Sequence, residues 1–245
     1  MKYLILLLLC GIILNSHTQQ ELSFSFGGGL SYLQFKPFED FTNSYNEQLS
    51  STITKSLKYN PFGFEVNVGL SYCVNKLYSG LRLGTSKSFT SKAEFEDGSR
   101  NFNFRGYNFD IIAGLKFGKV ITYFSMSLHS LNINTFYEFD GGIRSFGSDH
   151  NLSGVYTSSK MQGSLGLRFE EKQNKFGYFF DFLFPLNSRK YLGGTFYKQT
   201  NTTDAPFFPQ ENSNYGTLDS DLALPQSYRN IRLNIGFIYY LSINK

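Results

Sequence analysis

Tryptophan is absent from this 245-residue chain, and cysteine and histidine are scarce. The two cysteines are Cys10 and Cys73, and Cys10 lies in an N-terminal segment that we expect to be removed. A chain left with one cysteine forms no internal disulfide, so a fold held together by disulfides is excluded. No stretch after position 18 approaches the 18 uninterrupted apolar residues that would indicate a transmembrane helix.

The first 18 residues have the organisation of a secretory signal peptide. A positive charge at Lys2 precedes an apolar run from Leu4 to Leu14, and small or polar residues follow it. We expect cleavage after Thr18 and a single domain over residues 19–245. Lipidation of Cys10 is an alternative, but Leu9 precedes that cysteine and the apolar run continues beyond it.

Charge is spread thinly along the chain. The formal net charge is +4, and no cluster of lysines and arginines stands out, so nucleic acid is not an expected partner. Aromatic residues, in contrast, make up 18% of the chain, with 27 phenylalanines and 17 tyrosines. Such a content suits lipid contact and the aromatic girdles of membrane proteins.

Apolar residues recur at every second position in eight stretches. Because successive side chains of a strand point to opposite faces, each row forms one continuous apolar face. The row from Phe62 to Val74 exceeds the ~9–11 residues that a tilted strand needs to cross a bilayer. The pattern predicts an all-β fold, an eight-stranded antiparallel up-and-down transmembrane β-barrel with a side-chain-filled interior. Its strands are expected at 22–32, 62–74, 77–89, 107–117, 120–136, 161–169, 176–184 and 231–243.

The connections between these strands alternate between long and short. Asn75-Lys76 and Gly118-Lys119 are two-residue turns, and residues 172–175 form a third short turn. The segment 36–60 is polar, and polar residues also dominate from 90 to 101, where Asp97-Gly98 is a turn pair; both are expected to be long connections. Both termini then lie at the end of the short turns, an asymmetry that is typical of outer-membrane barrels.

A soluble, lipocalin-like barrel is the main alternative, because alternation alone does not say which face points inward. The polar face decides between the two. It consists of small residues with single charges between them, such as Glu65 and Arg82, rather than the Lys, Glu and Thr of a solvated face. This favours a narrow interior filled by the polar face, with the bulky apolar face toward lipid.

Seven charged residues are therefore assigned to the interior. Buried charges are tolerated when they are paired. Arg168 and Asp181 flank the third short turn symmetrically and are expected to pair across it. The expected network is a plug rather than a pore, and it comprises Glu65, Arg82, Asp110, Lys116, Arg168, Asp181 and Arg232.

The sequence gives little support for an enzymatic function. His129 and Ser130 are adjacent on one strand, so they point to opposite faces and cannot act as a base and nucleophile pair. Asp149-His150 and Asp219-Ser220-Asp221 faintly resemble the acidic and histidine sites of omptin-type proteases, and paired loop carboxylates also suit Ca²⁺. Neither set has a complete pattern, and we expect no catalytic residue, no cofactor and no metal site.

The segment from 186 to 227 is the best place for function, since long loops without a role are uncommon. Exposed aromatic residues on a rigid scaffold are a recurrent recognition device. The alternative, compatible with this one, is that the loop folds over the barrel mouth as a cap. The candidate recognition residues are Tyr191, Phe196, Tyr197, Phe207, Phe208 and Tyr215.

The leader, the eight rows and the loop asymmetry together resemble the small outer-membrane β-barrel proteins, of the OmpA-barrel, OmpX and PorT-like types. The resemblance rests on pattern and implies a location in the outer membrane, with both termini periplasmic. It implies outer-membrane lipid, the barrel assembly machinery and periplasmic chaperones as partners, and a surface or secretion-system partner. A structural or surface-interaction role is favoured over a PorT-like accessory role in secretion, and over a lipid- or peptide-modifying enzyme.

Overall fold

Eight long strands pair in a closed ring in the computed structural model, which describes residues 20–142, 144–145, 154–186, 197–198, 205–206 and 228–242. Every strand of the ring is antiparallel to both neighbours, and the last strand pairs with the first along its whole length. The eight predicted apolar rows thus correspond to eight observed strands. In ring order these are β1 (Gln20–Gln34), β3 (Phe62–Val74), β4 (Leu77–Ser88), β6 (Gly98–Phe117), β7 (Val120–Phe139), β9 (Gly154–Gln173), β10 (Phe176–Pro185) and β13 (Arg229–Ser242).

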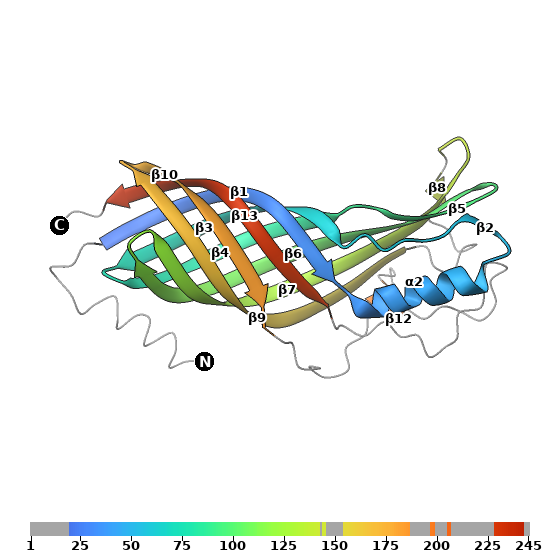
Figure 1. Cartoon of the computed structure of the whole chain (residues 1–245), viewed down its shortest axis with the longest axis horizontal. Coiled ribbons are helices and arrows are strands. Elements are labelled where there is room, and N and C mark those ends of the chain that lie inside the picture. Colours follow the sequence, from blue (N-terminus) through green and yellow to red (C-terminus); the bar gives the residue numbers. More distant parts are fainter. Residues whose placement is uncertain are drawn as a thin grey trace.

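The three short turns connect the ring strands at one end. Asn75, Gly118 and Asn174 open these turns with φ values of 56°, 60° and 59°. Such left-handed backbone fits the tight hairpin turns that match strand twist. Glu21 pairs with both Cys73 and Ser242, so both ends of the described chain lie at the turn end, as predicted (Figure 1). The predicted leader, residues 1–18, lies outside the described residues.

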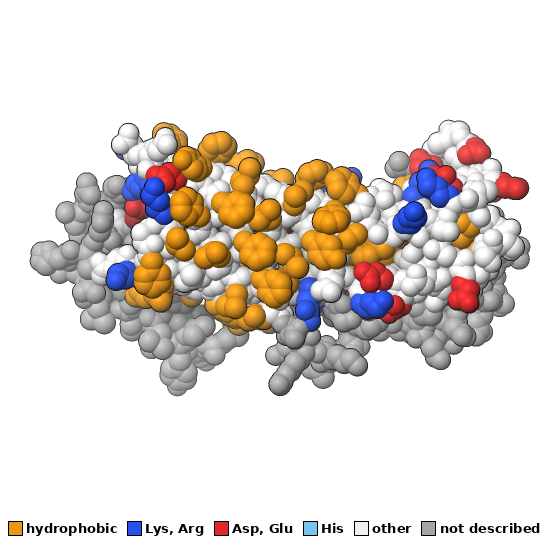
Figure 2. All heavy atoms as spheres, in the orientation of Figure 1, with side chains coloured by type: hydrophobic (Ala, Val, Ile, Leu, Met, Phe, Trp, Pro, Cys, Tyr) orange, Lys and Arg blue, Asp and Glu red, His pale blue; other side chains and the backbone are white. Residues whose placement is uncertain are grey.

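The outer face of the ring is apolar. Ile235 and Phe237 on β13 have 63% and 74% of their surface exposed, and Phe176 on β10 has 66%. Figure 2 shows orange side chains spread over the strands in a broad belt, with blue and red charges gathered toward its two ends. Isolated exposed apolar residues are normal, but a contiguous belt of this kind requires something to cover it.

The segment 36–60 is not the polar loop that the sequence predicted. Residues Lys36–Gln48 form the helix α2, with Pro37 in its first turn, and Ile53–Lys55 form the short strand β2. Phe38, Phe41 and Tyr45 are buried at helical spacing. The error has a physical reason: three aromatics on one helix face suffice to bury that face, although the surrounding residues are polar enough to resemble a loop.

None of the helices among the described residues is long and apolar enough to cross a membrane.

Strands β6, β7 and β9 are longer than predicted and run beyond the end of the ring opposite the turns. β6 begins at Gly98 rather than at Tyr107, and β5 (Ser91–Phe95) pairs with it through the predicted Asp97-Gly98 turn. The stretch 90–101 was therefore wrongly predicted as a long polar connection, since it contains β5 and the start of β6. Three further short strands continue the sheet, namely β8 (Arg144–Ser145), β11 (Tyr197–Lys198) and β12 (Ala205–Pro206).

A hydrophobic core lies at this far end, where α2 covers the protruding strands. We call the unit formed by α2, β2, β5 and the distal halves of β6 and β7 the helix-capped extension (Figure 1). Phe38 is completely buried, and its ring centroid lies 4.8 Å from that of Phe104 and 5.3 Å from that of Phe102. The buried core also contains Leu33, Phe35, Phe41, Tyr45, Leu49, Leu57, Ala93, Phe95, Leu131, Ile133, Tyr137 and Tyr228.

The apolar face changes sides along a single strand. Within the ring, Phe109 of β6 faces outward and Asp110 faces the interior. Beyond the ring, Phe102 and Phe104 lie on the inner face against α2, and Arg105 is exposed on the outer face. β7 repeats this inversion, with Leu128 exposed in the ring and Leu131 and Ile133 buried under α2, the last of these completely.

Replacement of Phe38 by alanine is expected to unfold the extension while the ring persists. Large-to-small changes of buried phenylalanine cost ~3–5 kcal/mol. Limited proteolysis should then cut within residues 36–58 much faster than in the parent protein. Asn43→Ala, at an exposed position of the same helix, is the control and should leave the cleavage rate unchanged. Equal protection of Phe38→Ala and parent would refute the assignment of Phe38 to the core.

Candidate functional site

The interior of the ring contains an ion-pair network centred on Asp110. The Asp110 carboxylate accepts from Arg82 Nε at 2.8 Å, and its Oδ2 lies 3.0 Å from Arg232 Nη1. Arg82 also pairs with Asp181, and Arg232 pairs with Glu65 at 3.4 Å. These five side chains come from β3, β4, β6, β10 and β13 and are almost entirely buried, so they connect more than half of the ring.

The predicted pair of Arg168 and Asp181 does not form. The two residues are direct cross-strand partners in register, but Asp181 binds Arg82 and accepts a hydrogen bond of 2.6 Å from the Tyr123 hydroxyl. Arg168 turns toward Glu170, with 2.9 Å between Nε and Oε1, and lies over the Phe179 ring. The guanidinium groups are long enough to reach across the narrow interior. Distance in space, and not cross-strand register, therefore decides which carboxylate each arginine pairs with.

Glu170 is the interior carboxylate that the sequence analysis missed. It is buried, and its Oε2 lies 2.9 Å from Lys116 Nζ. Glu170 follows Phe169, at which strand six was predicted to end, whereas β9 continues to Gln173. With this residue, the four interior cations Arg82, Lys116, Arg168 and Arg232 face four carboxylates, Glu65, Asp110, Asp181 and Glu170, and their formal charges cancel.

A glycine makes room for the tyrosine of this network. A Cβ atom on Gly166 would lie 2.0 Å from Cζ of Tyr123. The Tyr123 ring therefore lies against the β9 backbone, and from this position its hydroxyl reaches Asp181. Sequence alternation places Tyr123 on the inner face but gives no indication of this contact.

The interior is filled along its whole length. Toward the turns, Tyr78, Ile112, Ile121, Tyr123 and Leu183 form an apolar cluster. On the other side of the ion network, the His129 Nδ1 atom lies 3.2 Å from the hydroxyl of Tyr228, which belongs to the core of the extension. His129 is buried and the adjacent Ser130 lines the outer wall, so they lie on opposite faces as predicted.

The remaining candidates lie mostly outside the described residues. This holds for Tyr191, Phe196, Phe207, Phe208 and Tyr215, and also for Asp149-His150 and Asp219-Ser220-Asp221. Tyr197 lies in β11, where it pairs with Thr157 of β9 and Pro206 of β12. Among the described residues, no group of three His, Cys, Asp or Glu side chains is arranged to hold a metal ion.

Comparison with known proteins gives only remote likeness. Neither a protein-family model nor a curated protein matches the chain. Among solved structures, it is similar to Ail, the attachment invasion locus protein of Yersinia pestis, in complex with the heparin analogue sucrose octasulfate. That match has a TM-score of 0.44 and 11% identity, and it covers 91% of this chain and 99% of Ail. A second Ail structure gives a TM-score of 0.39 at the same identity and coverage.

Replacement of Asp181 by alanine is expected to lower the free energy of unfolding by ~3–5 kcal/mol, because it leaves part of a buried charge pair uncompensated. A denaturant titration measures this change. Glu171→Gln is the control, since it removes only the more exposed pair with Lys119, and it should cost less than ~1 kcal/mol. Similar costs for the two variants would contradict the network.

A double-mutant cycle separates the two candidate partners of Asp181. The substitutions Arg82→Met and Asp181→Ala should couple by more than about 1 kcal/mol, since their side chains are in contact. Arg168→Met and Asp181→Ala should couple more weakly than the first pair, since Arg168 pairs with Glu170 and only faces Asp181 across the hairpin. Stronger coupling in the second cycle would restore the pairing inferred from hairpin register.

Proposed function

We propose that this chain is an eight-stranded up-and-down β-barrel of a bacterial outer membrane. It has no chemistry of its own and presents the helix-capped extension and its long connections for interaction at the cell surface. The observation that carries the proposal is the change of the apolar face from the outside of the ring to the inside of the extension.

Two different surroundings explain that change. A ring surrounded by water would place its apolar face inward along the whole strand, as lipocalin-like barrels do. Here, β6 and β7 place bulky apolar residues outward in the ring and inward, against α2, beyond it. Lipid around the ring and water around the extension account for both halves of each strand.

The orientation follows from the same asymmetry. Outer-membrane barrels keep short turns on the periplasmic side and longer connections outside. The three two-residue turns and both ends of the described chain then face the periplasm, and the extension faces the exterior. The resemblance also suggests a second function, a PorT-like role in secretion. A component of a periplasmic assembly would use the end with the short turns for its contacts. The helix-capped extension lies at the opposite end, so surface interaction is favoured.

The filled interior supports a structural role over transport. Eight strands leave an interior just wide enough for side chains, whereas porins with 16–18 strands leave an aqueous channel. The balanced charges and the two flanking apolar clusters fit a closed barrel, and we expect no porin-like conductance in planar bilayers.

Replacement of Ile235 by arginine tests whether lipid surrounds the ring. This side chain is 63% exposed, so in a water-soluble protein the change should alter stability by no more than ~0.5 kcal/mol. In a barrel, an arginine on the lipid face costs ~2–4 kcal/mol at the midplane and less near the interfaces. Unfolding from lipid vesicles measures the difference, with Ile235→Leu as control. An unaffected Ile235→Arg variant would count against lipid around this face.

Trypsin treatment of intact cells tests the orientation. The segment 186–227 contains Arg189 and Lys190 and should be cut from outside, while the ring strands survive as a protected fragment. A periplasmic marker protein that stays intact is the control. Cleavage only after the outer membrane is broken would reverse the orientation and favour the secretion role.

A further inference from the structure

Two cations lie side by side on the outer wall, at the level where the outward residues of β6 turn polar, and exposed Phe64 and Phe89 flank them on the β3 side. Lys87 of β4 and Arg105 of β6 are direct cross-strand partners, and both are exposed. No carboxylate among the described residues forms an ion pair with either of them. Like charges in direct cross-strand positions repel each other. Exposed cations near the turns differ, since Lys119 pairs with Glu171 and Lys172 with Glu21.

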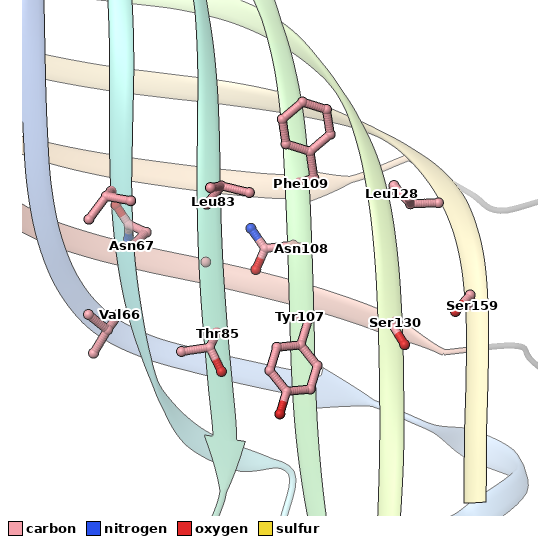
Figure 3. A pocket seen from close by; sticks show the side chains of 12 residues that line it. Val66, Asn67, Leu83, Thr85, Tyr107, Asn108, Phe109, Leu128, Ser130 and Ser159 are labelled. Atoms are coloured by element: carbon pink, nitrogen blue, oxygen red, sulfur yellow. The ribbon is translucent and has the colours of Figure 1, made fainter. Parts of the chain in front are cut away.

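An apolar hollow of about 550 Å³ adjoins these cations on the side of the belt. Leu83, Phe109 and Leu128 contribute its apolar walls, and the small side chains of Thr85, Ser130 and Ser159 leave the space open. Figure 3 shows these side chains coming from neighbouring strands of the wall. The hollow is open on its outer side, which suits an acyl chain lying along the wall.

A polar groove of about 480 Å³ lies on the other side of the cations. Lys87 and Arg105 line it, together with Asn103, Asn132 and Asn134. The Oδ1 atoms of Asn132 and Asn134 are buried and have no hydrogen-bond partner among the described residues. Unpaired buried carbonyl oxygens are costly, and both side chains are half-buried. Rotation of each amide would turn its oxygen toward the groove, where a ligand hydroxyl would donate to it.

The hollow and the groove are parts of one continuous surface. Tyr107 lines both, and it follows Arg105 by two residues on the same face of β6. Glu138 is the one carboxylate among the lining residues of the groove, and it lies six residues beyond Asn132 along β7. Along the wall, this surface therefore has an apolar part (the hollow), a cationic part (Lys87 and Arg105) and a part rich in amide side chains (the groove).

We propose that this surface binds one acylated phosphoglycolipid of the outer leaflet. Its acyl chains occupy the hollow, a phosphate lies between Lys87 and Arg105, and sugar hydroxyls donate to Asn132 and Asn134. The assignment rests on the proposed membrane barrel, since it needs a leaflet at this level of the wall. Lysine and arginine are the usual partners of lipid phosphates at membrane surfaces.

The test is lipid retention by the full chain purified in detergent. The probes are lipid A with both phosphates and the same lipid with both phosphates removed, and native mass spectrometry measures the bound fraction. Two interfacial cations contribute about 1 kcal/mol each, so the parent protein should prefer the phosphorylated lipid roughly thirtyfold. The double variant Lys87→Gln/Arg105→Gln should lose this preference.

Matched variants show whether a change in lipid retention comes from this site or from any loss of charge or any bulky substitution on the barrel. Lys76→Gln/Lys175→Gln removes the same net charge at the short turns and should keep the preference. Ser130→Phe fills the hollow and should weaken retention of both lipids, whereas Ser79→Phe, on the wall near the turns, should not. Equal loss in both charge variants, or full retention in Lys87→Gln/Arg105→Gln, would overturn the site.

Insertion into phosphatidylcholine vesicles, followed by protease protection, is measured in parallel. A parent protein that inserts but shows no phosphate preference would overturn the lipid site and leave the membrane barrel standing. A parent protein that fails to insert would overturn the barrel itself. Displacement of the lipid by millimolar inorganic phosphate alone would reduce the site to a plain anion site and overturn the assignment of a lipid.

Discussion

Closure of the sheet is the constraint on which the rest of this structure depends. When the last strand pairs with the first, no backbone edge is left open, and every second side chain is forced into a narrow interior. Those side chains must fill the space and satisfy one another. The network around Asp110 meets this requirement, because carboxylates and guanidinium groups from five strands neutralise one another where no solvent replaces a missing partner.

The surroundings then decide what each strand carries on its other face. Within the ring, most outward residues of β6 and β7 are apolar, and beyond the ring they are polar apart from Phe136. The extension buries its apolar residues by recruiting α2, since water on the outside favours the opposite arrangement. One continuous strand thus has lipid beside one part and water beside the other, and Arg105 marks where the change occurs in β6.

Much of the ring was predictable because period-two alternation depends on neighbours along the chain. All eight strands, the three short turns and the inward placement of Glu65, Arg82, Asp110 and Asp181 follow from it. The helix α2 was missed because its aromatic face is short and set among polar residues. The start of β6 was missed because its apolar residues shift to the other face, and the end of β9 was missed because residues 170–173 are all polar. Glu170 was missed as an interior residue because it lies in this end of β9.

By itself, the sequence determined which residues share a face within the ring and how many strands the ring contains, because both are local properties of an alternating pattern. Only the tertiary structure decided which charges meet. Arg82 reaches Asp181 across the interior, and Arg168, the register partner of Asp181, turns to Glu170 instead. An arginine side chain is long enough to pair with a carboxylate on a strand other than its neighbour. The closure of the ring decides which carboxylates lie within its reach.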